Sequence, residues 1–171
     1  NSWKWKSLRE VAKINYGKSA SAILSDDGDT PVVGTGGVER YGRVYLYDGE
    51  SIILGRKGTI DRVSFVAGKF WPIDTTYFLS DFQDETSVRW LYYFLQTVDL
   101  RSLNEATGVP SLSRELLYKL RVPTPPPHEQ AKTAEVLSVL DRAIEQTEVL
   151  IAKQQRIKTG LMQDLLTKGI D

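Results

Sequence analysis

A run of prolines three-quarters of the way along the chain limits the possible folds more than any other feature. The run is Pro123-Thr124-Pro125-Pro126-Pro127. Because proline fixes φ and lacks an N–H, the run predicts a stiff, extended connection. Residues 128–167 then contain no proline and a single glycine, Gly160. The sequence therefore divides at the prolines into a domain at about 1–124 and a separate segment at 125–171.

The segment after the prolines has the apolar spacing of one long helix. Its apolar residues recur at intervals near three and four, as in a coiled-coil seam, and Thr147, Gln154 and Lys158 interrupt them. Forty helical residues are roughly 60 Å long, so a domain of this size cannot bury the whole seam, and a partner helix is needed. We predict a helix over about 126–167 whose seam consists of Val136, Leu137, Leu140, Ile144, Leu150, Ile151, Ile157, Leu161 and Leu165.

The charges along this predicted helix indicate the direction of its partner. Five acidic and two basic residues occupy the first half, whereas four basic residues and one acidic residue occupy the second half. In an antiparallel pair of identical helices each acidic half lies beside a basic half, whereas a parallel pair brings like charges together. We therefore expect an antiparallel pair, formed with a second copy of the chain or with a homologous helix.

The first 80 residues have the pattern of a β-rich domain. Short runs of Val, Ile, Tyr and Phe alternate with glycine-containing turns, as expected for several short strands. Such closely spaced strands predict a small curved sheet or a partly closed barrel. The expected strands cover residues 11–16, 31–33, 43–47, 51–54, 62–66 and 75–79.

The pattern changes to helical periodicity after the last of these strands. Residues 86–100 place Val88, Leu91, Tyr92, Leu95 and Val98 on one helical face. A shorter helix is expected over 114–119, followed by an extended piece at 120–122. The predicted fold class is α+β, with a β-rich domain and small helices followed by one long, coiled-coil-forming helix.

Composition argues against several kinds of active site. The chain has no cysteine and one histidine, His128, so neither a zinc site nor a histidine-dependent hydrolytic triad is expected. Asp61, Asp74 and Glu85 make only a weak candidate for an acidic nuclease cluster. Lys and Arg number 22, as do Asp and Glu, which argues against a protein that coats nucleic acid but leaves room for a local basic face. These features favour a reader or scaffold over a catalyst.

Four segments, taken together and in order, carry a family resemblance. They are WKWKSLREVAKINYG at 3–17, PVVGTGGVERYG at 31–42, IILGRKGTIDRVSFVAGKFWPIDTTYFL at 52–79, and the stretch from ATGVPSL at 106 to LLTKGID at 171. With them the chain resembles one half of the DNA-specificity subunit of type I restriction–modification enzymes, that is, one target recognition domain followed by one spacer helix.

The resemblance implies a role in which this chain has no catalysis of its own. A complete subunit of that family has two recognition domains and two antiparallel helices that set the spacing between two DNA half-sites. The implied partners are double-stranded DNA, methyltransferase subunits and restriction subunits, in the cytoplasm. S-adenosylmethionine would bind the methyltransferase, and we expect no cofactor or metal in this chain. One domain with one helix is then either a piece of a longer subunit or a half-subunit whose homodimer reads a two-fold symmetric target.

Cations near glycines are the first candidates for DNA contact. Gly55-Arg56-Lys57-Gly58 stands between two predicted strands. We expect a hairpin tip there, where Arg makes a fork contact to guanine and Lys neutralises phosphate. Contact with the DNA backbone, contact with a base and a purely structural turn are the three alternatives for this pair. The candidate DNA-contacting residues are Lys18, Ser19, Arg40, Tyr41, Arg43, Arg56, Lys57 and Lys69, with Arg114 as a secondary candidate and Tyr16 and Tyr45 as surface aromatic candidates.

A second class of protein fits the same pattern. A β-rich module on a coiled-coil stalk that binds another protein would also have balanced charge. Binding of methyltransferase subunits and of bipartite DNA distinguishes the two. A stand-alone nuclease is a third alternative, which the absent cysteine and the single histidine weaken.

Overall fold

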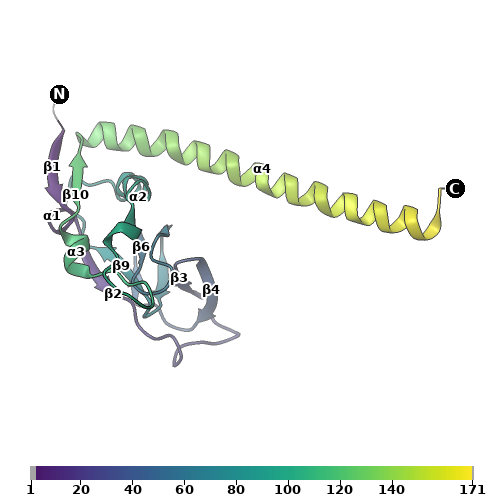
Figure 1. Cartoon of the computed structure of the whole chain (residues 1–171), viewed down its shortest axis with the longest axis horizontal. Helices are drawn as coiled ribbons and strands as arrows, with labels where there is room; N and C mark the ends of the chain where they lie inside the picture. The colour runs from purple at the N-terminus through teal and green to yellow at the C-terminus, as the bar shows by residue number, and fades with distance from the viewer. Residues whose placement is uncertain (1–2, 171) are drawn as a thin grey trace. The chain divides into compact units, whose positions relative to one another are not determined.

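The computed structural model describes residues 3–170 and divides the chain into two compact units (Figure 1). The first unit, which we call the head, comprises residues 1–131, and the second comprises residues 132–171. The head contains all strands and all short helices of the described residues. The boundary lies inside the long helix, a few residues after the proline run at which the sequence predicts the division.

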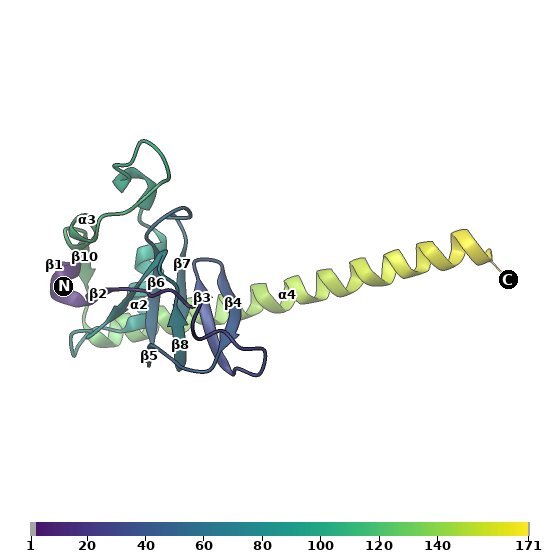
Figure 2. The same cartoon turned by 90° about the horizontal axis from the view of Figure 1, so that it is seen from below.

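Two four-stranded sheets form the centre of the head (Figure 2). The first has the order β2-β9-β6-β7 and is antiparallel throughout. The second has the order β4-β3-β8-β5, with β3 parallel to β8. The bounds are β2 Lys13–Tyr16, β9 Thr76–Ser80, β6 Ser51–Gly55 and β7 Val63–Val66 for the first, and β4 Gly37–Gly42, β3 Thr30–Gly34, β8 Lys69–Pro72 and β5 Tyr47–Asp48 for the second.

One core cluster joins the two sheets. It contains Val33 of β3, Ile53 of β6, Phe70 of β8 and Phe78 of β9, all buried. The rings of Phe70 and Phe78 meet edge to face at 6.3 Å, an arrangement that aromatic quadrupoles favour. The expected single curved sheet or partly closed barrel is thus wrong in detail. Two sheets form because β6 and β9 are buried along their whole length, so their inner face needs a second sheet to cover it.

Helix α2, Val88–Gln96, packs on the first sheet through contacts with β6 and β7. The Ser87 hydroxyl accepts a hydrogen bond from the Trp90 N–H at 3.3 Å and caps the helix. The expected helix over 86–100 ends early, and a separate 3₁₀ helix η1, Leu100–Leu103, follows with Asp99 as its cap. Helix α3, Arg114–Tyr118, and strand β10, Arg121–Thr124, lie where short elements were predicted.

Two predicted strands differ from the structure. The expected strand at 11–16 begins only at Lys13, because Leu8–Val11 forms the short helix α1, whose Glu10 carboxylate accepts hydrogen bonds from the N–H and the hydroxyl of Ser7. The expected strand at 43–47 is largely irregular, because the Arg43 N–H bonds to the Ile23 carbonyl outside any sheet. Strand β4 instead begins inside the glycine-rich turn, and the β8 strand was not predicted.

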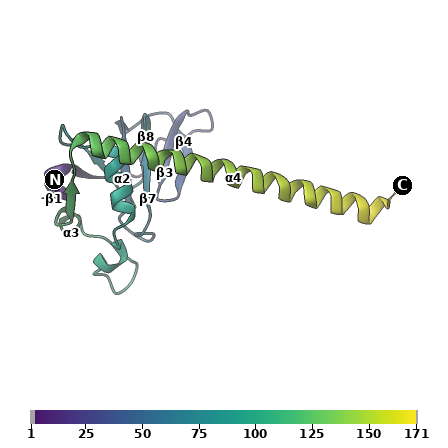
Figure 3. The same ribbon diagram turned by 90° about the horizontal axis from the view of Figure 1, so that it is seen from above.

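The proline run is shared between two elements. Pro123 and Thr124 belong to β10, which pairs antiparallel with β1, Lys4–Ser7. Pro127 is the first residue of the long helix α4, Pro127–Lys168, a position where the missing N–H costs nothing. Figure 3 shows α4 as one uninterrupted helix. The helix was expected from about residue 126 to 167, so its ends agree within one residue.

Gln130 ties the start of α4 to the head. Its side chain is buried, accepts a hydrogen bond from the Ser87 N–H at 2.9 Å, and donates to the Glu85 and Pro125 carbonyls at 3.1 and 2.8 Å. Replacing Gln130 with Ala leaves three backbone groups without these partners, so we expect a loss of about 1–3 kcal/mol in the free energy of unfolding.

Denaturant unfolding followed by tryptophan fluorescence measures this loss in the head, because all four tryptophans lie before residue 131. Gln154→Ala, at an exposed position of the same helix, is the matched control and should change stability by less than about 0.5 kcal/mol. Equal losses in the two variants would contradict the assigned role of Gln130.

Candidate nucleic-acid interface

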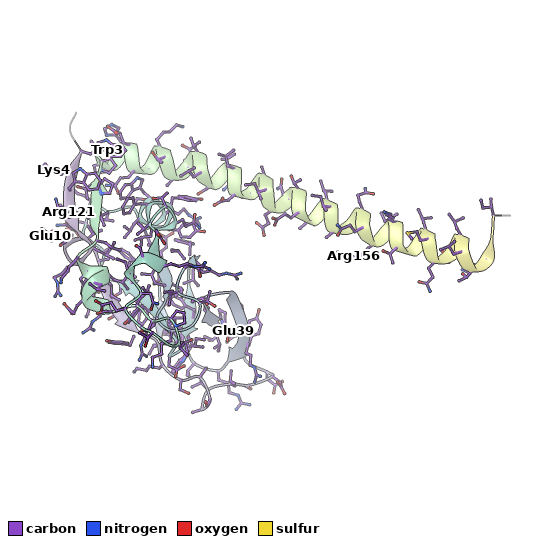
Figure 4. The ribbon with its side chains drawn as sticks, in the orientation of Figure 1. Trp3, Lys4, Glu10, Glu39, Arg121 and Arg156 are labelled. Atoms are coloured by element: carbon purple, nitrogen blue, oxygen red, sulfur yellow. The ribbon has the colours of Figure 1, made fainter. Side chains whose placement is uncertain are left out.

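The candidate DNA-contacting residues of the head lie at four places: on and after strand β4, on the loop after β2, at the start of β8, and where β6 ends. β4 is an edge strand, and its residues Val38, Glu39, Arg40 and Tyr41 are all exposed. Figure 4 labels Glu39 on this strand. We call Val38–Tyr41, together with the segment 23–26 behind them, the β4 surface.

The β4 surface offers hydrogen-bond donors, an acceptor and a ring on adjacent positions. Arg40 pairs with Val32 of β3, and Tyr41, 52% exposed, pairs with Pro31. Arg40 and Tyr41 line a hollow together with Leu24, Ser25 and Asp26. The pair thus places a guanidinium and a phenol at adjacent positions of the edge strand.

The segment 20–25 holds the back of this surface in place. The Ser25 N–H donates to the Tyr41 carbonyl at 3.1 Å, and the Arg43 N–H donates to the Ile23 carbonyl at 3.0 Å. The Arg43 side chain also donates from Nε to the Ser25 hydroxyl at 2.8 Å. The Arg43 side chain therefore stabilises this segment. Only its terminal nitrogens remain as donors for DNA.

Lys18 and Ser19 lie on a loop whose backbone is fixed and whose side chains are exposed. The Lys18 N–H donates to the Pro72 carbonyl, and the Trp71 indole donates to the Lys18 carbonyl, each at 2.9 Å. A Cβ at Gly17 would lie 1.9 Å from the Ile73 carbonyl oxygen, so only glycine fits there. Trp71 thus anchors this loop through a hydrogen bond that no local pattern of the sequence indicates.

Lys69 and Tyr45 form a cation–π pair near the same sheet. The Lys69 Nζ lies 4.9 Å from the centre of the Tyr45 ring, and that ring is 48% exposed. The two residues come from β8 and from the irregular stretch before β5, so their proximity is a product of the fold. Their ring and charge remain open to solvent.

The glycine-bounded segment after β6 differs from the hairpin tip expected for it. β6 and β7 do pair antiparallel, but residues 56–58 bond to two other segments. The N–H groups of Arg56 and Lys57 donate to the Thr75 carbonyl at 2.9 and 3.2 Å, and the Leu112 N–H donates to the Arg56 carbonyl at 3.0 Å. The glycines serve this backbone: a Cβ at Gly55 would lie 1.9 Å from the Thr59 carbonyl oxygen, and Gly58 has a φ of +80°.

This arrangement brings the guanidinium groups of two arginines close to one tyrosine ring. The Arg56 Cζ lies 5.2 Å, and the Arg114 Cζ 4.9 Å, from the centre of the Tyr16 ring. The Tyr16 ring in turn lies 5.2 Å from the Tyr77 ring. Burial, and after it the neighbouring Tyr16 phenol, raises the pKa of Tyr77, so this group stays neutral beside the two arginines. The sequence named Tyr16, Arg56 and Arg114 separately, and only the fold brings them together.

The predicted seam of α4 is largely exposed in the second unit. Eight of its nine residues, all except Leu137, are each 45–59% exposed. Two ion pairs of this unit, Lys132–Glu135 and Asp164–Lys168, join neighbours on the helix itself. Figure 4 shows the side chains projecting all around the helix, with Arg156 labelled in its second half.

Among residues 3–170 no group of three His, Cys, Asp or Glu side chains is placed to hold a metal ion. Asp61, one of the three residues considered as a weak nuclease cluster, pairs with Arg101 at 2.5 Å. In the same part of the chain, none of the helices is both long and apolar enough to cross a membrane.

A comparison with protein families identifies the chain. The model of the type I restriction modification DNA specificity domain matches residues 1–154. The chain belongs to this family. A putative type I restriction enzyme specificity subunit of Haemophilus influenzae is 24% identical over 143 residues, which are 80% of this chain and 37% of that protein. The MjaVIII specificity subunit of Methanocaldococcus jannaschii is 28% identical over 131 residues, 73% of this chain and 28% of that protein.

Solved structures of type I specificity subunits share the fold. The S subunit of a type I restriction–modification system from M. genitalium superposes with a TM-score of 0.76 at 18% identity, covering 96% of this chain and 46% of that one. The HsdS subunit from Thermoanaerobacter tengcongensis gives a TM-score of 0.66 at 14% identity, over 99% and 46% of the two chains. The chain thus spans less than half the length of these type I specificity subunits.

Proposed function

We propose that this chain is the sequence-reading half of a type I specificity subunit. Its head recognises double-stranded DNA, and α4 pairs antiparallel with a second copy or a second half, so that two heads address a bipartite target. Methyl transfer and cleavage belong to partner methyltransferase and restriction subunits, and S-adenosylmethionine binds the methyltransferase. The family match over residues 1–154 carries this proposal. It does not support the alternative of a protein-binding module without DNA specificity.

The β4 surface supports the DNA-reading part of the proposal. Reading a base edge requires donors and acceptors held at fixed positions by a rigid scaffold. Arg40, Glu39 and Tyr41 supply such groups on one edge strand, and the hydrogen bonds of Ser25 and Arg43 fix the segment behind it. Among the described residues no ion pair involves Arg40. Its guanidinium therefore does not have to give up a carboxylate partner before it binds DNA.

The exposed seam of α4 supports the pairing part of the proposal. Large exposed apolar residues along one side of the helix form a surface whose burial is favourable by about 25 cal/mol for each Å². An antiparallel helix of the same sequence covers that stripe. The basic second half of this partner helix then lies near Glu145 and Glu148 of the first helix. A second copy and the missing half of a longer subunit meet this requirement equally.

Selection from a pool of random duplexes tests the proposed function. The purified chain is incubated with random 40-bp duplexes, bound molecules are amplified, and the enriched sequences are determined. We expect a bipartite motif, two-fold symmetric if two identical copies pair. Methyl incorporation into the enriched duplex by the modification subunits of the same organism then tests the partnership. A bound pool with the composition of the input pool would reject the proposal.

Replacing Arg40 with Ala tests whether the β4 surface reads bases. If Arg40 makes a two-pronged contact with a guanine, its removal costs about 1–3 kcal/mol at one base-pair position and relaxes the preference there. The measurement is the dissociation constant for the selected duplex and for its single-base variants. Arg89→Ala removes an exposed arginine of α2 that stacks on Phe65 and is the matched control. Uniform weakening at all positions in the Arg40 variant would place Arg40 on the DNA backbone instead.

A further inference from the structure

The Tyr16 ring is a meeting point for positive charge from segments far apart in the sequence. Tyr16 ends β2, Arg56 follows β6, and Arg114 begins α3. Both guanidinium groups lie about the ring, with Cζ at 5.2 and 4.9 Å from its centre. Lys57, next to Arg56 in the chain, is exposed and adds a third cation. The ring itself is 45% exposed, so the group is open to a ligand.

These cations have no carboxylate partners among the described residues. The ion pairs of the head join Arg9 to Glu115, Lys13 to Asp81 and Arg101 to Asp61, and none includes Arg56, Lys57 or Arg114. The Arg56 Nη1 donates instead to the backbone carbonyl of Asp74 at 2.8 Å. The Arg114 Nε is closed off from solvent and has no hydrogen-bond partner. Adjacent like charges repel each other, so an anion bound between them would stabilise the group.

We propose that Tyr16, Arg56 and Arg114, with Lys57 beside them, bind a phosphate of the DNA backbone. This group, hereafter the phosphate clamp, rests on the proposed function and adds a sequence-independent anchor to it. The chemistry fits: a planar guanidinium donates two parallel N–H bonds to phosphate oxygens, and phosphate contacts fix the register of a protein on a duplex. The β4 surface then reads bases while the clamp fixes the head on the backbone.

The fold holds the clamp in position before any ligand binds. The backbone on both sides of Arg56 is fixed by the hydrogen bonds to Thr75 and from Leu112. The Tyr77 hydroxyl, beneath Tyr16, donates to the Leu112 carbonyl at 3.0 Å, close to the start of α3. Groups fixed in this way lose little conformational entropy on binding. This rigidity distinguishes the clamp from flexible surface lysines.

Salt dependence of duplex binding measures the clamp directly. Each phosphate that a protein neutralises contributes about 0.9 to the slope of log affinity against log salt concentration. For the full chain and a mixed-sequence 30-bp duplex, Arg56→Ala/Arg114→Ala removes the contact with one phosphate and should make this slope less steep by about 0.9. The double variant Arg89→Ala/Arg121→Ala removes two exposed arginines from α2 and β10 and should retain the slope of the unaltered chain.

Charge-retaining variants separate the clamp from a structural role of the same residues. Arg56→Lys/Arg114→Lys should keep the original slope within about 0.3, and tryptophan fluorescence should show that every variant is folded under the conditions of the binding measurement. A slope unchanged in the alanine variant, a slope equally reduced in the lysine variant, or no binding of the duplex by the unaltered chain would overturn the clamp. So would saturable binding of inorganic phosphate, at constant ionic strength, that displaces the duplex, since the site would then serve a small anion.

The clamp and the proposed function fail in different ways. Loss of the clamp should weaken the selected duplex and the mixed duplex by the same factor, so that the ratio of the two dissociation constants stays unchanged. A changed ratio would place Arg56 or Arg114 on a base and overturn the clamp, while the proposed function would stand. If the unaltered chain binds all duplexes with equal affinity, sequence recognition is rejected. The slope of log affinity against log salt concentration still measures the phosphate contacts in that case.

Discussion

Leu140→Asp and Ile144→Asp, each alone, should abolish pairing of α4 at micromolar concentration while the head stays folded. Both side chains belong to the exposed stripe, at 53 and 58% exposure, and a partner helix would bury them. An unpaired charge buried there costs about 3–5 kcal/mol, which corresponds to a factor of roughly 10² to 4 × 10³ in the dissociation constant. Sedimentation equilibrium gives that constant, and tryptophan fluorescence reports the head alone, because residues 132–171 contain no aromatic residue.

Val149→Asp is the matched control for these two variants. Val149 is also apolar and 62% exposed, but it lies outside the predicted seam. At 100° per residue it is about 180° around the helix from Leu140, so a charge there should leave pairing within about 1 kcal/mol of the unaltered chain. Equal disruption by all three variants would show that the seam is misassigned, and an unaltered chain that stays monomeric would reject pairing with a second copy.

The direction of the pair has its own test, since the chain contains no cysteine. A single cysteine in place of Leu165 meets its own copy only in a parallel pair, because an antiparallel pair places the two positions far apart along the helix axis. We expect no disulfide-linked dimer on oxidation. Efficient cross-linking would contradict the antiparallel arrangement that the sorted charges predict.

Phe70→Ala should destabilise the head by about 3–5 kcal/mol, the usual cost of truncating a fully buried phenylalanine. Phe70 is 0% exposed and packs against Phe78 across the two sheets, and its ring lies 5.6 Å from the ring of Tyr47. The cavity left by the substitution would weaken the packing of β8 on β9. β8 contains Lys69, and its last residue, Pro72, accepts the hydrogen bond that fixes the backbone of Lys18. Because domains are stable by only about 5–15 kcal/mol, much of the stability of the head would be lost.

Denaturant unfolding followed by tryptophan fluorescence measures this loss. Tyr45→Ala removes an aromatic side chain that is 48% exposed and should cost less than about 1 kcal/mol. If the two variants lost similar stability, the shared core of the two sheets would not be the principal contact between them. DNA binding by the Phe70 variant should weaken in parallel with the fraction of unfolded head, without a change in sequence preference.

The local features of the sequence that agree with the structure are those that depend on neighbouring residues. The paired strands at 51–54 and 62–66, the short helix after Ser113 and the long helix after the prolines follow from periodicity and from residues that start or stop an element. The strands at 43–47 and 11–16 were misplaced, because hydrogen bonds with distant segments and the Glu10 capping contacts outweigh a short alternating pattern.

The candidate DNA contacts show the same division. Arg40 and Tyr41 could be named from a polar, glycine-rich stretch, but their place on an edge strand was hidden, because the strand order β4-β3-β8-β5 and the hydrogen bonds of residues 23–25 with 41–43 join residues far apart in the sequence. The assignment of Arg56 and Lys57 to DNA contact is untested by the fold itself. Their expected hairpin tip, however, is joined to residues 75 and 110–112, which no local pattern reveals.

The sequence by itself determined a β-rich domain, one long helix with an apolar seam, and charges sorted along that helix, because periodicity, proline and charge order act over a few residues. Only the tertiary structure decided that the strands form two sheets around Phe70 and that Tyr16, Arg56 and Arg114 share one place. Contacts between residues 40 to 100 positions apart depend on how the strands stack, and stacking is set by the packing of the whole core rather than by any single segment.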